Sequence, residues 1–299
     1  DCLLSRGLGD VYKRQPYKSA LKLLLTEVYA SEHPQVRCLS LRFKQAVYDG
    51  QLDLDELDPY VLIYRRLEEY LQARGETERL ELVRRCLYLK VNKKISKPPR
   101  HREKSWQRLL LERLTGEWGW GERQLILLDS RSQWKVRQVT AERQALVNEL
   151  NYSYRFLSMF ARSRPEGAAA STRDMAVLGR RLYAAFERRA GKVEFINPGI
   201  APDLGEDTLT LVHAPAPRGE RWALYNGSLG AQEWPDFAPL RKSRSLIELL
   251  AWSHRNGVID SATHLSLHPG DSDLSEFELS QLLGLSLIHI SEPTRQEAI

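Results

Sequence analysis

The sequence predicts a mainly α-helical protein with a smaller α+β region at its C-terminal end. Apolar residues recur at helical spacing over about 16–190, and the pattern changes after Gly191 to short strands and helices over about 191–284. We therefore expect a helical domain followed by a truncated α+β region. The 299 residues are 42% hydrophobic with a net charge of +5, a composition that argues against disorder. A run of about 18 uncharged apolar residues is missing, so we expect no membrane span.

Capping residues mark the helices of the first region. Asp58 and Pro59 form an N-cap followed by proline at the first helical position, and Gly75 ends that helix. The next helix is expected to run to about residue 95, where a basic loop to Lys104 begins, and a long helix is expected over about 132–162. Other helices are expected to begin near residues 16, 106 and 171.

The second region shows strand patterns separated by Pro, Gly and Asn. Strands are expected at Lys192–Asn197, Thr208–His213, Arg221–Tyr225 and His264–His268, and helices at Ser245–Asn256 and Ser275–Leu283. Three cysteines without metal-site spacing predict neither a disulfide framework nor a zinc site, and they favour a reducing, cytoplasmic setting. Two of them, Cys38 and Cys86, are expected to be buried in helices.

The two ends of the chain can be encoded by complementary strands of the same DNA sequence. A back-translation of residues 1–15, read on the opposite strand, gives residues 285–299 at every position. We interpret both ends as artefacts, translated inverted repeats that resemble transposon-type sequencing adapters; a genuine mobile-element end is the alternative. The protein itself is therefore expected to occupy residues 16–284, as an internal piece of a longer chain.

Familiar catalytic patterns do not assemble in this sequence. A nucleotidyl-transfer site needs Gly-Ser followed closely by Asp-x-Asp, but Gly227-Ser228 and Asp271-Ser272-Asp273 lie over forty residues apart. We interpret the two aspartates as turn and cap residues. The histidines are scattered, and only His264 and His268 share a strand face. We therefore expect no metal site among them.

Basic residues are the more informative candidates. The Arg-Arg pairs at 65/66, 84/85, 180/181 and 188/189 suit phosphate contacts, although a solvated helix face with partners such as Glu81 for Arg85 explains them too. The run from Lys90 to Lys104 could contact nucleic acid electrostatically, but it lacks interleaved aromatic residues and reads more simply as a solvated loop. The segment Glu117-Trp118-Gly119-Trp120 predicts a rigid corner that ends a helix.

Specific strings in the chain resemble the class I, enterobacterial-type adenylate cyclases. They are residues 16–22 (PYKSALK), 82–91 (LVRRCLYLKV), 117–120 (EWGW), 182–187 (LYAAFE), 191–193 (GKV) and 197–204 (NPGIAPDL). Their order and spacing match across 16–284, and the likeness weakens after about Gly227.

The resemblance implies a cytoplasmic enzyme that converts ATP to 3′,5′-cyclic AMP and pyrophosphate with Mg²⁺. The family's Gly-Ser and Asp-x-Asp motif lies N-terminal to the part covered here, so no catalytic residue is carried over and this fragment is expected to be inactive. The resemblance also implies control by the glucose phosphotransferase system through a regulatory half that lies outside this segment.

Within the matching strings, Arg84, Arg85 and Lys90 are our candidate contacts to the ATP triphosphate, because basic residues concentrate there. Two other interpretations remain open. The chain could be a non-enzymatic helical interaction module that shares ancestry with the cyclases. It could also be a basic nucleic-acid-binding protein, for which we expect no support from salt-dependent binding to DNA or RNA.

Overall fold

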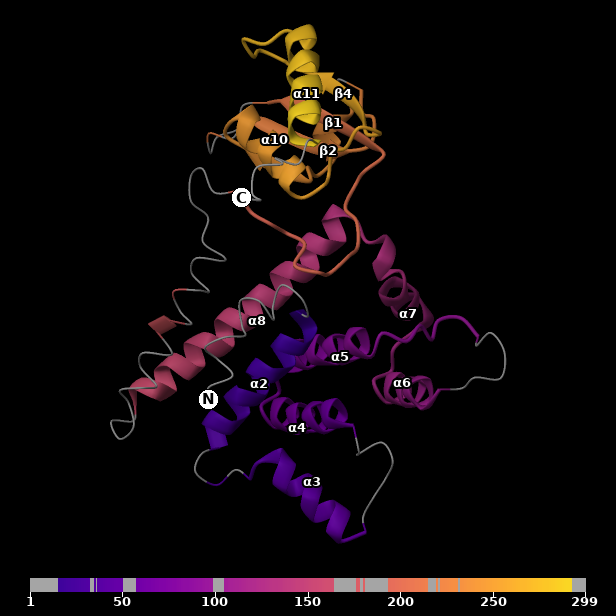
Figure 1. Ribbon diagram of the computed structural model, residues 1–299, viewed down its shortest axis with the longest axis vertical. Helices are drawn as coiled ribbons and strands as arrows, with labels where there is room; N and C mark the ends of the chain where they lie inside the picture. The colour runs from indigo at the N-terminus through magenta and orange to yellow at the C-terminus, as the bar shows by residue number, and fades with distance from the viewer. Residues whose placement is uncertain are drawn as a thin grey trace, which may run out of the picture. The chain divides into compact units, whose positions relative to one another are not determined.

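A computed structural model describes residues 16–32, 35, 37–50, 58–98, 105–163, 176–177, 180, 193–214, 219, 221–230 and 232–291 (Figure 1). The chain divides into two compact units. The first contains Asp1–Ser132, Ala141–Glu187 and Pro198–Ile200, and the second contains Gln133–Thr140, Arg188–Asn197 and Ala201–Ile299. The mainly helical fold with a smaller α+β part, as predicted, is confirmed.

Helices build the described part of the first unit (Figure 1). They are α2 (Pro16–Glu32), α3 (Leu39–Tyr48), α4 (Pro59–Ala73), α5 (Thr77–Val91), α6 (Trp106–Glu117), α7 (Glu122–Asp129) and, from Ala141 onward, α8 (Val136–Arg162). Helices α2, α4 and α5 pack against one another and form the centre of this unit. Its core consists of side chains that are at most 1% exposed, among them Leu21, Leu24, Val28, Tyr64, Leu67, Leu71, Val83, Cys86 and Leu87.

Local signals set the turn between α4 and α5 where the sequence predicts it, whereas α5 ends at Val91 and not near residue 95. The Asp58 carboxylate accepts hydrogen bonds from the backbone N–H groups of Tyr60 and Val61, at 2.7 and 3.2 Å, so it caps the first turn of α4. Gly75 adopts a φ of +68°, a left-handed conformation that glycine reaches without steric cost. Asn92 ends α5 in the same region of φ. The hairpin is therefore encoded by its own caps.

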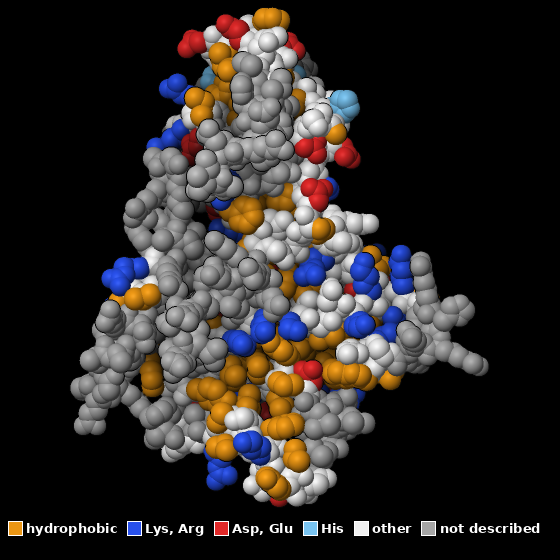
Figure 2. All heavy atoms as spheres, in the orientation of Figure 1, with side chains coloured by type: hydrophobic (Ala, Val, Ile, Leu, Met, Phe, Trp, Pro, Cys, Tyr) orange, Lys and Arg blue, Asp and Glu red, His pale blue; other side chains and the backbone are white. Residues whose placement is uncertain are grey.

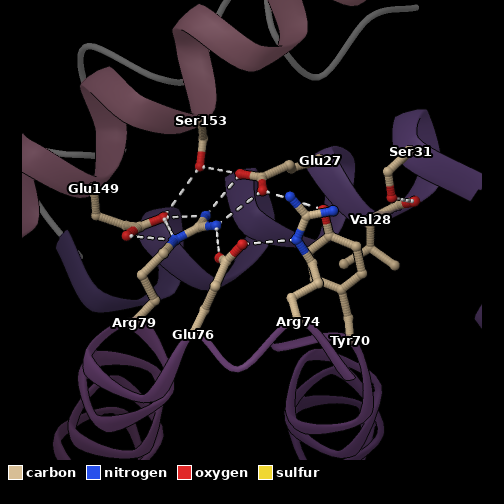
Figure 3. A network of polar contacts seen from close by, with 9 residues as sticks. All are labelled: Glu27, Val28, Ser31, Tyr70, Arg74, Glu76, Arg79, Glu149 and Ser153. Atoms are coloured by element: carbon tan, nitrogen blue, oxygen red, sulfur yellow. Dashed lines mark hydrogen bonds and ion pairs between the residues drawn. The ribbon is translucent and has the colours of Figure 1, made fainter. Parts of the chain in front are cut away.

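A buried ionic network joins α2, α5 and α8 (Figure 3). The Arg79 guanidinium of α5 binds Glu27 of α2 at 2.8 Å and Glu149 of α8 at 2.6 Å, and it also binds Glu76. The side chains of Glu27 and Glu149 are only 0% and 6% exposed. Ser153 of α8 donates a further hydrogen bond to Glu27, at 2.8 Å. One arginine thereby neutralises carboxylates from two other helices.

The second unit contains a four-stranded sheet of order β3-β2-β1-β4. Its strands are β1 (Thr208–His213), β2 (Trp222–Asn226), β3 (Arg241–Ser243) and β4 (His264–His268). β1 pairs antiparallel with β2 and parallel with β4, and β2 pairs antiparallel with β3. Helix α10 (Leu246–Arg255) packs on β2 and β3, and α11 (Glu276–Ser291) packs on β4 (Figure 1).

The strand expected at Lys192–Asn197 is wrong in its described part. Residues 193–197 are irregular, because their backbone pairs with a side chain instead of a neighbouring strand. The Asn256 amide accepts a hydrogen bond from the backbone N–H of Ile196 and donates one to the carbonyl of Glu194, at 2.8 and 2.9 Å. This amide satisfies backbone groups that a sheet would otherwise pair.

Three further expectations need correction. The sequence predicts no bounds for helix α3, which follows Cys38, and none of the side chains of α3 is buried. Cys38 precedes that helix and is exposed, whereas Cys86 is buried as expected. Helix α11 continues past Gly284 to Ser291, into the segment interpreted as an artefact. The basic loop over 99–104 and most of the helix expected from residue 171 lie outside the described residues.

Replacing Arg79 with Met should lower the free energy of unfolding by about 3–5 kcal/mol, because Glu27 and Glu149 would remain buried without their partner. Urea denaturation measures this loss. The matched control is Arg74→Met, whose side chain is 41% exposed and pairs with Glu76 at the surface, and it should cost less than about 1 kcal/mol. Adding Glu27→Gln and Glu149→Gln to Arg79→Met should restore part of the loss. Equal effects of the two arginine substitutions would contradict this account.

Candidate functional site

Helix α5 carries the three candidate residues that the sequence singles out, but it does not bring them together. Successive residues of an α-helix are rotated by about 100°, so Arg84 and Arg85 leave the helix in different directions, and Lys90 lies on a third. Each therefore has its own surroundings within the first unit.

Arg84 is engaged by carboxylates of its own unit. Its guanidinium forms ion pairs with Glu81 at 2.5 Å and with Glu68 at 3.5 Å, and its Cζ atom lies 5.9 Å from the centre of the Trp118 ring. Burial opposes the charged form, but the interactions with Glu81 and Tyr64 together outweigh it and raise the pKa of Arg84. A phosphate could reach this guanidinium only in competition with two carboxylates.

The predicted tryptophan corner is confirmed, and it fixes this part of α5. Gly119, with a φ of +69°, turns the chain after α6. The Trp118 indole donates a hydrogen bond to the Tyr64 hydroxyl, at 2.5 Å. The Trp120 indole donates one to Glu81, at 3.1 Å, and the two indole rings meet edge to face with centroids 4.7 Å apart. The corner therefore ties α6 to α4 and α5.

Arg85 faces α8 and meets a buried acid. Its Nη2 atom lies 3.5 Å from Glu142, so its partner is not Glu81, the one that the sequence suggested. Three buried polar atoms in this neighbourhood have no hydrogen-bond partner among the residues that the structure describes: Tyr17 Oη, Arg85 Nε and Glu142 Oε1. Burial raises the pKa of Glu142, and the charges of Arg85 and Arg131 only partly oppose that effect. The ionised form of this acid is therefore held at a cost.

Lys90 lies beside an aromatic ring of α4. Its ammonium group lies 4.4 Å from the centre of the Tyr60 ring on α4, and the ammonium group of Lys18 on α2 lies 6.0 Å from the same centre. Arg131 binds the Asn92 amide oxygen, at 3.3 Å, so it lies where α5 ends. Lysine and arginine side chains gather over α2 and α5 in Figure 2.

Sequence reasoning missed Lys18. It lies in the matching string PYKSALK, but no pattern along the chain pairs residue 18 with residue 90. The packing of α2 against α4 and α5 alone brings the two lysines to one aromatic ring.

The first part of the basic run, residues 92–98, is held in place rather than loosely solvated. The Arg108 guanidinium of α6 donates hydrogen bonds to the backbone carbonyls of Lys94, Ile95 and Lys97, at 2.8, 3.3 and 2.7 Å. Asp129 accepts a hydrogen bond from the backbone N–H of Ser96, at 2.8 Å. The buried Tyr88 hydroxyl donates to the other oxygen of Asp129, at 2.6 Å. The lysines of this loop, Lys93, Lys94 and Lys97, are exposed.

The motifs of the second unit show no catalytic assembly among the described residues. Gly227 turns the chain after β2 with a φ of +91°, and the Ser228 hydroxyl contacts that of Ser266 at 2.8 Å. Asp271 and Asp273 lie in the bend before α11. Across the described ranges, no three His, Cys, Asp or Glu side chains gather as metal ligands would. Among the described helices, none combines the length and apolar character needed to cross a bilayer.

Glu142 and Glu76 should give pH dependences of opposite sign. The pKa of Glu142 is higher in the folded protein than in the unfolded chain. Its contribution to stability is therefore fully present below its unfolded-state pKa and is lost as pH rises through its folded-state pKa. Glu142→Gln should therefore gain stability relative to the wild type between about pH 4 and 7. Burial of Glu76 is outweighed by hydrogen bonds from Arg74 and Arg79, which lower its pKa, so Glu76→Gln should lose relative stability over the same range. Urea denaturation across pH checks both, and parallel curves would contradict the assignment.

Comparisons with known proteins match both units. A family model described as the second domain of class-I adenylate cyclase matches residues 4–197, and one for the third domain matches residues 204–288. Proteins named adenylate cyclase are 43% identical in Salmonella typhimurium and 42% identical in Escherichia coli, each over 266 residues and 87% of this chain. The one from Proteus mirabilis is 38% identical over 288 residues and 93% of the chain.

The chain spans about a third of the length of these curated relatives, 31% for the first two and 33% for the third. No solved structure matches the chain significantly. Because one family model alone covers more than half of the residues and the second covers most of the remainder, the chain belongs to the class-I adenylate cyclase family.

Proposed function

We propose that this chain forms the second and third domains of a cytoplasmic enzyme that converts ATP to 3′,5′-cyclic AMP and pyrophosphate. The single observation that carries the proposal is the joint match to both domain models, in order and almost without a gap. The name adenylate cyclase on relatives that are 38–43% identical supports it.

In this reaction the ribose 3′-oxygen attacks the α-phosphorus, its proton leaves, and pyrophosphate departs. Negative charge grows on the leaving group, so cations beside the β- and γ-phosphates stabilise the transition state. Within this chain we propose Lys90, Arg84 and Arg85 for that role. Lys90 has no ion pair among the described residues, whereas both arginines would first have to leave a carboxylate.

The Mg²⁺ that we propose for the enzyme is assigned to no residue here, because the described side chains form no group that fits it. Because the matched models are those of the second and third domains, we propose that the chemical step takes place on the domain that precedes them in the family and that this chain alone is inactive. Control by a component of the glucose phosphotransferase system is proposed for regions outside the matched domains.

A chimaera tests the proposal directly. Residues 16–284 would replace the matching third of the Escherichia coli enzyme, in a strain without its own cyclase, and cellular cyclic AMP would be measured. We expect the chimaera to restore cyclic AMP and the isolated chain to produce none. A folded chimaera without activity would contradict the proposal, as would cyclic AMP made by the isolated chain.

Within an active chimaera, Lys90→Ala should raise KM for ATP or lower kcat by about tenfold, the typical value of one charge-assisted hydrogen bond. Arg84→Ala and Arg85→Ala should act in the same direction. Lys44→Ala is the matched control, because Lys44 is an exposed lysine on α3. Unchanged kinetics at unchanged thermal stability would remove the residue concerned from the proposed set.

A further inference from the structure

We propose that the chain has a preorganised binding site for a polyphosphate, built by the five lysines Lys18, Lys90, Lys93, Lys94 and Lys97. We call this set the basic corner. The inference deepens the contact proposed above for Lys90 and rests on the proposed function only for the source of the ligand, the triphosphate of ATP or the pyrophosphate product. Its physical basis is independent of catalysis.

The basic corner brings Lys18 and Lys90 to one aromatic ring, and its other three lysines follow Lys90 within seven residues of the chain. Lys18 and Lys90 approach one aromatic ring from two different helices, at 6.0 and 4.4 Å from its centre. Among the residues that the structure describes, no carboxylate lies within ion-pair distance of any of the five ammonium groups. Asp58 is the acid next to Tyr60 in sequence, and it is occupied in capping α4. The like charges of Lys18 and Lys90 repel each other beside this ring, and a multivalent anion between them would remove that repulsion.

The loop that carries three of the lysines is ordered by groups that a solvated loop would not need. Arg108 donates hydrogen bonds to three of its carbonyl oxygens, so the negative ends of these peptide dipoles face the guanidinium of α6. Asp129 also holds this loop, but as a hydrogen-bond acceptor, because its carboxylate accepts a hydrogen bond from the backbone N–H of Ser96. A site that is already ordered loses less entropy when its ligand binds.

The same geometry favours a small polyphosphate over a nucleic acid. Single-stranded nucleic acids need aromatic rings on which successive bases stack. Among the described residues, the aromatic ring that contacts lysines of the basic corner is that of Tyr60, and two lysines flank it. The lysines therefore offer charge without a stacking platform, which suits a compact chain of phosphates.

Calorimetric titration of the full chain with inorganic triphosphate tests the inference, at low and at high salt. We expect salt-sensitive binding that the double substitution Lys18→Gln and Lys90→Gln weakens by about tenfold or more. The control is Arg42→Gln with Lys44→Gln on α3, which removes the same charge elsewhere and should leave the affinity unchanged. A parallel titration with ATP and with pyrophosphate distinguishes the two sources of the ligand.

A second pair of variants tests the ordering of the loop. Arg108→Lys keeps the charge but loses the planar fork that binds three carbonyls, and it should weaken triphosphate binding by roughly threefold or more. Arg113→Lys makes the same change on the same helix, away from the loop, and should have no effect. Melting temperatures of all variants show whether the fold is intact.

The outcomes separate this inference from the proposed function. Absence of triphosphate binding at low salt, or equal affinity in the Lys18/Lys90 variant and its control, overturns the inference even if the chimaera makes cyclic AMP. Tighter binding of a single-stranded oligonucleotide than of triphosphate overturns it too. Specific triphosphate binding alongside an inactive chimaera supports the basic corner and contradicts the cyclase proposal.

Discussion

The packing of the first unit depends on the guanidinium of Arg79, whose side chain is only 14% exposed. Arg79 neutralises Glu27 and Glu149, which come from the helices before and after it in the chain, and it thereby sets how α2, α5 and α8 meet. Carboxylates removed from water this completely are tolerated only with a charged, hydrogen-bonded partner. A hydrophobic core alone would let these helices slide, whereas the fixed hydrogen-bond directions of the arginine fork select one arrangement.

This arrangement decides which basic residues of α5 are available. With α5 fixed by Arg79, the next turn directs Arg84 toward Glu81 and Glu68, and Arg85 toward Glu142 on α8. Two of the three cations that the sequence singled out therefore serve internal pairing. The third, Lys90, emerges where α5 ends, beside a lysine of α2. The candidate site follows from the helix packing as much as from the string of basic residues.

Polar side chains also fix the backbone of segments that lack regular secondary structure. Arg108 and Asp129 hold the backbone of residues 92–98, and the Asn256 amide holds residues 194–196. In each case a side chain distant in sequence satisfies backbone groups that a helix or a sheet would otherwise pair. The local sequence pattern predicts a solvated loop or a strand for such segments, because it does not show the distant side chain that binds their backbone. The error at Lys192–Asn197 arose in this way.

By itself the sequence determined the mainly helical fold, the α4–α5 hairpin, three of the four strands and the tryptophan corner, because caps, glycines and periodicity are local and act on neighbouring residues. It also indicated the family, because several short sequence strings match that family in their order and spacing along the chain. Only the tertiary structure decided the partners of each charge: Glu142 instead of Glu81 for Arg85, and Lys18 beside Lys90. The physical reason is that electrostatic partners are chosen by distance in space, and residues far apart in sequence become neighbours only when the helices pack.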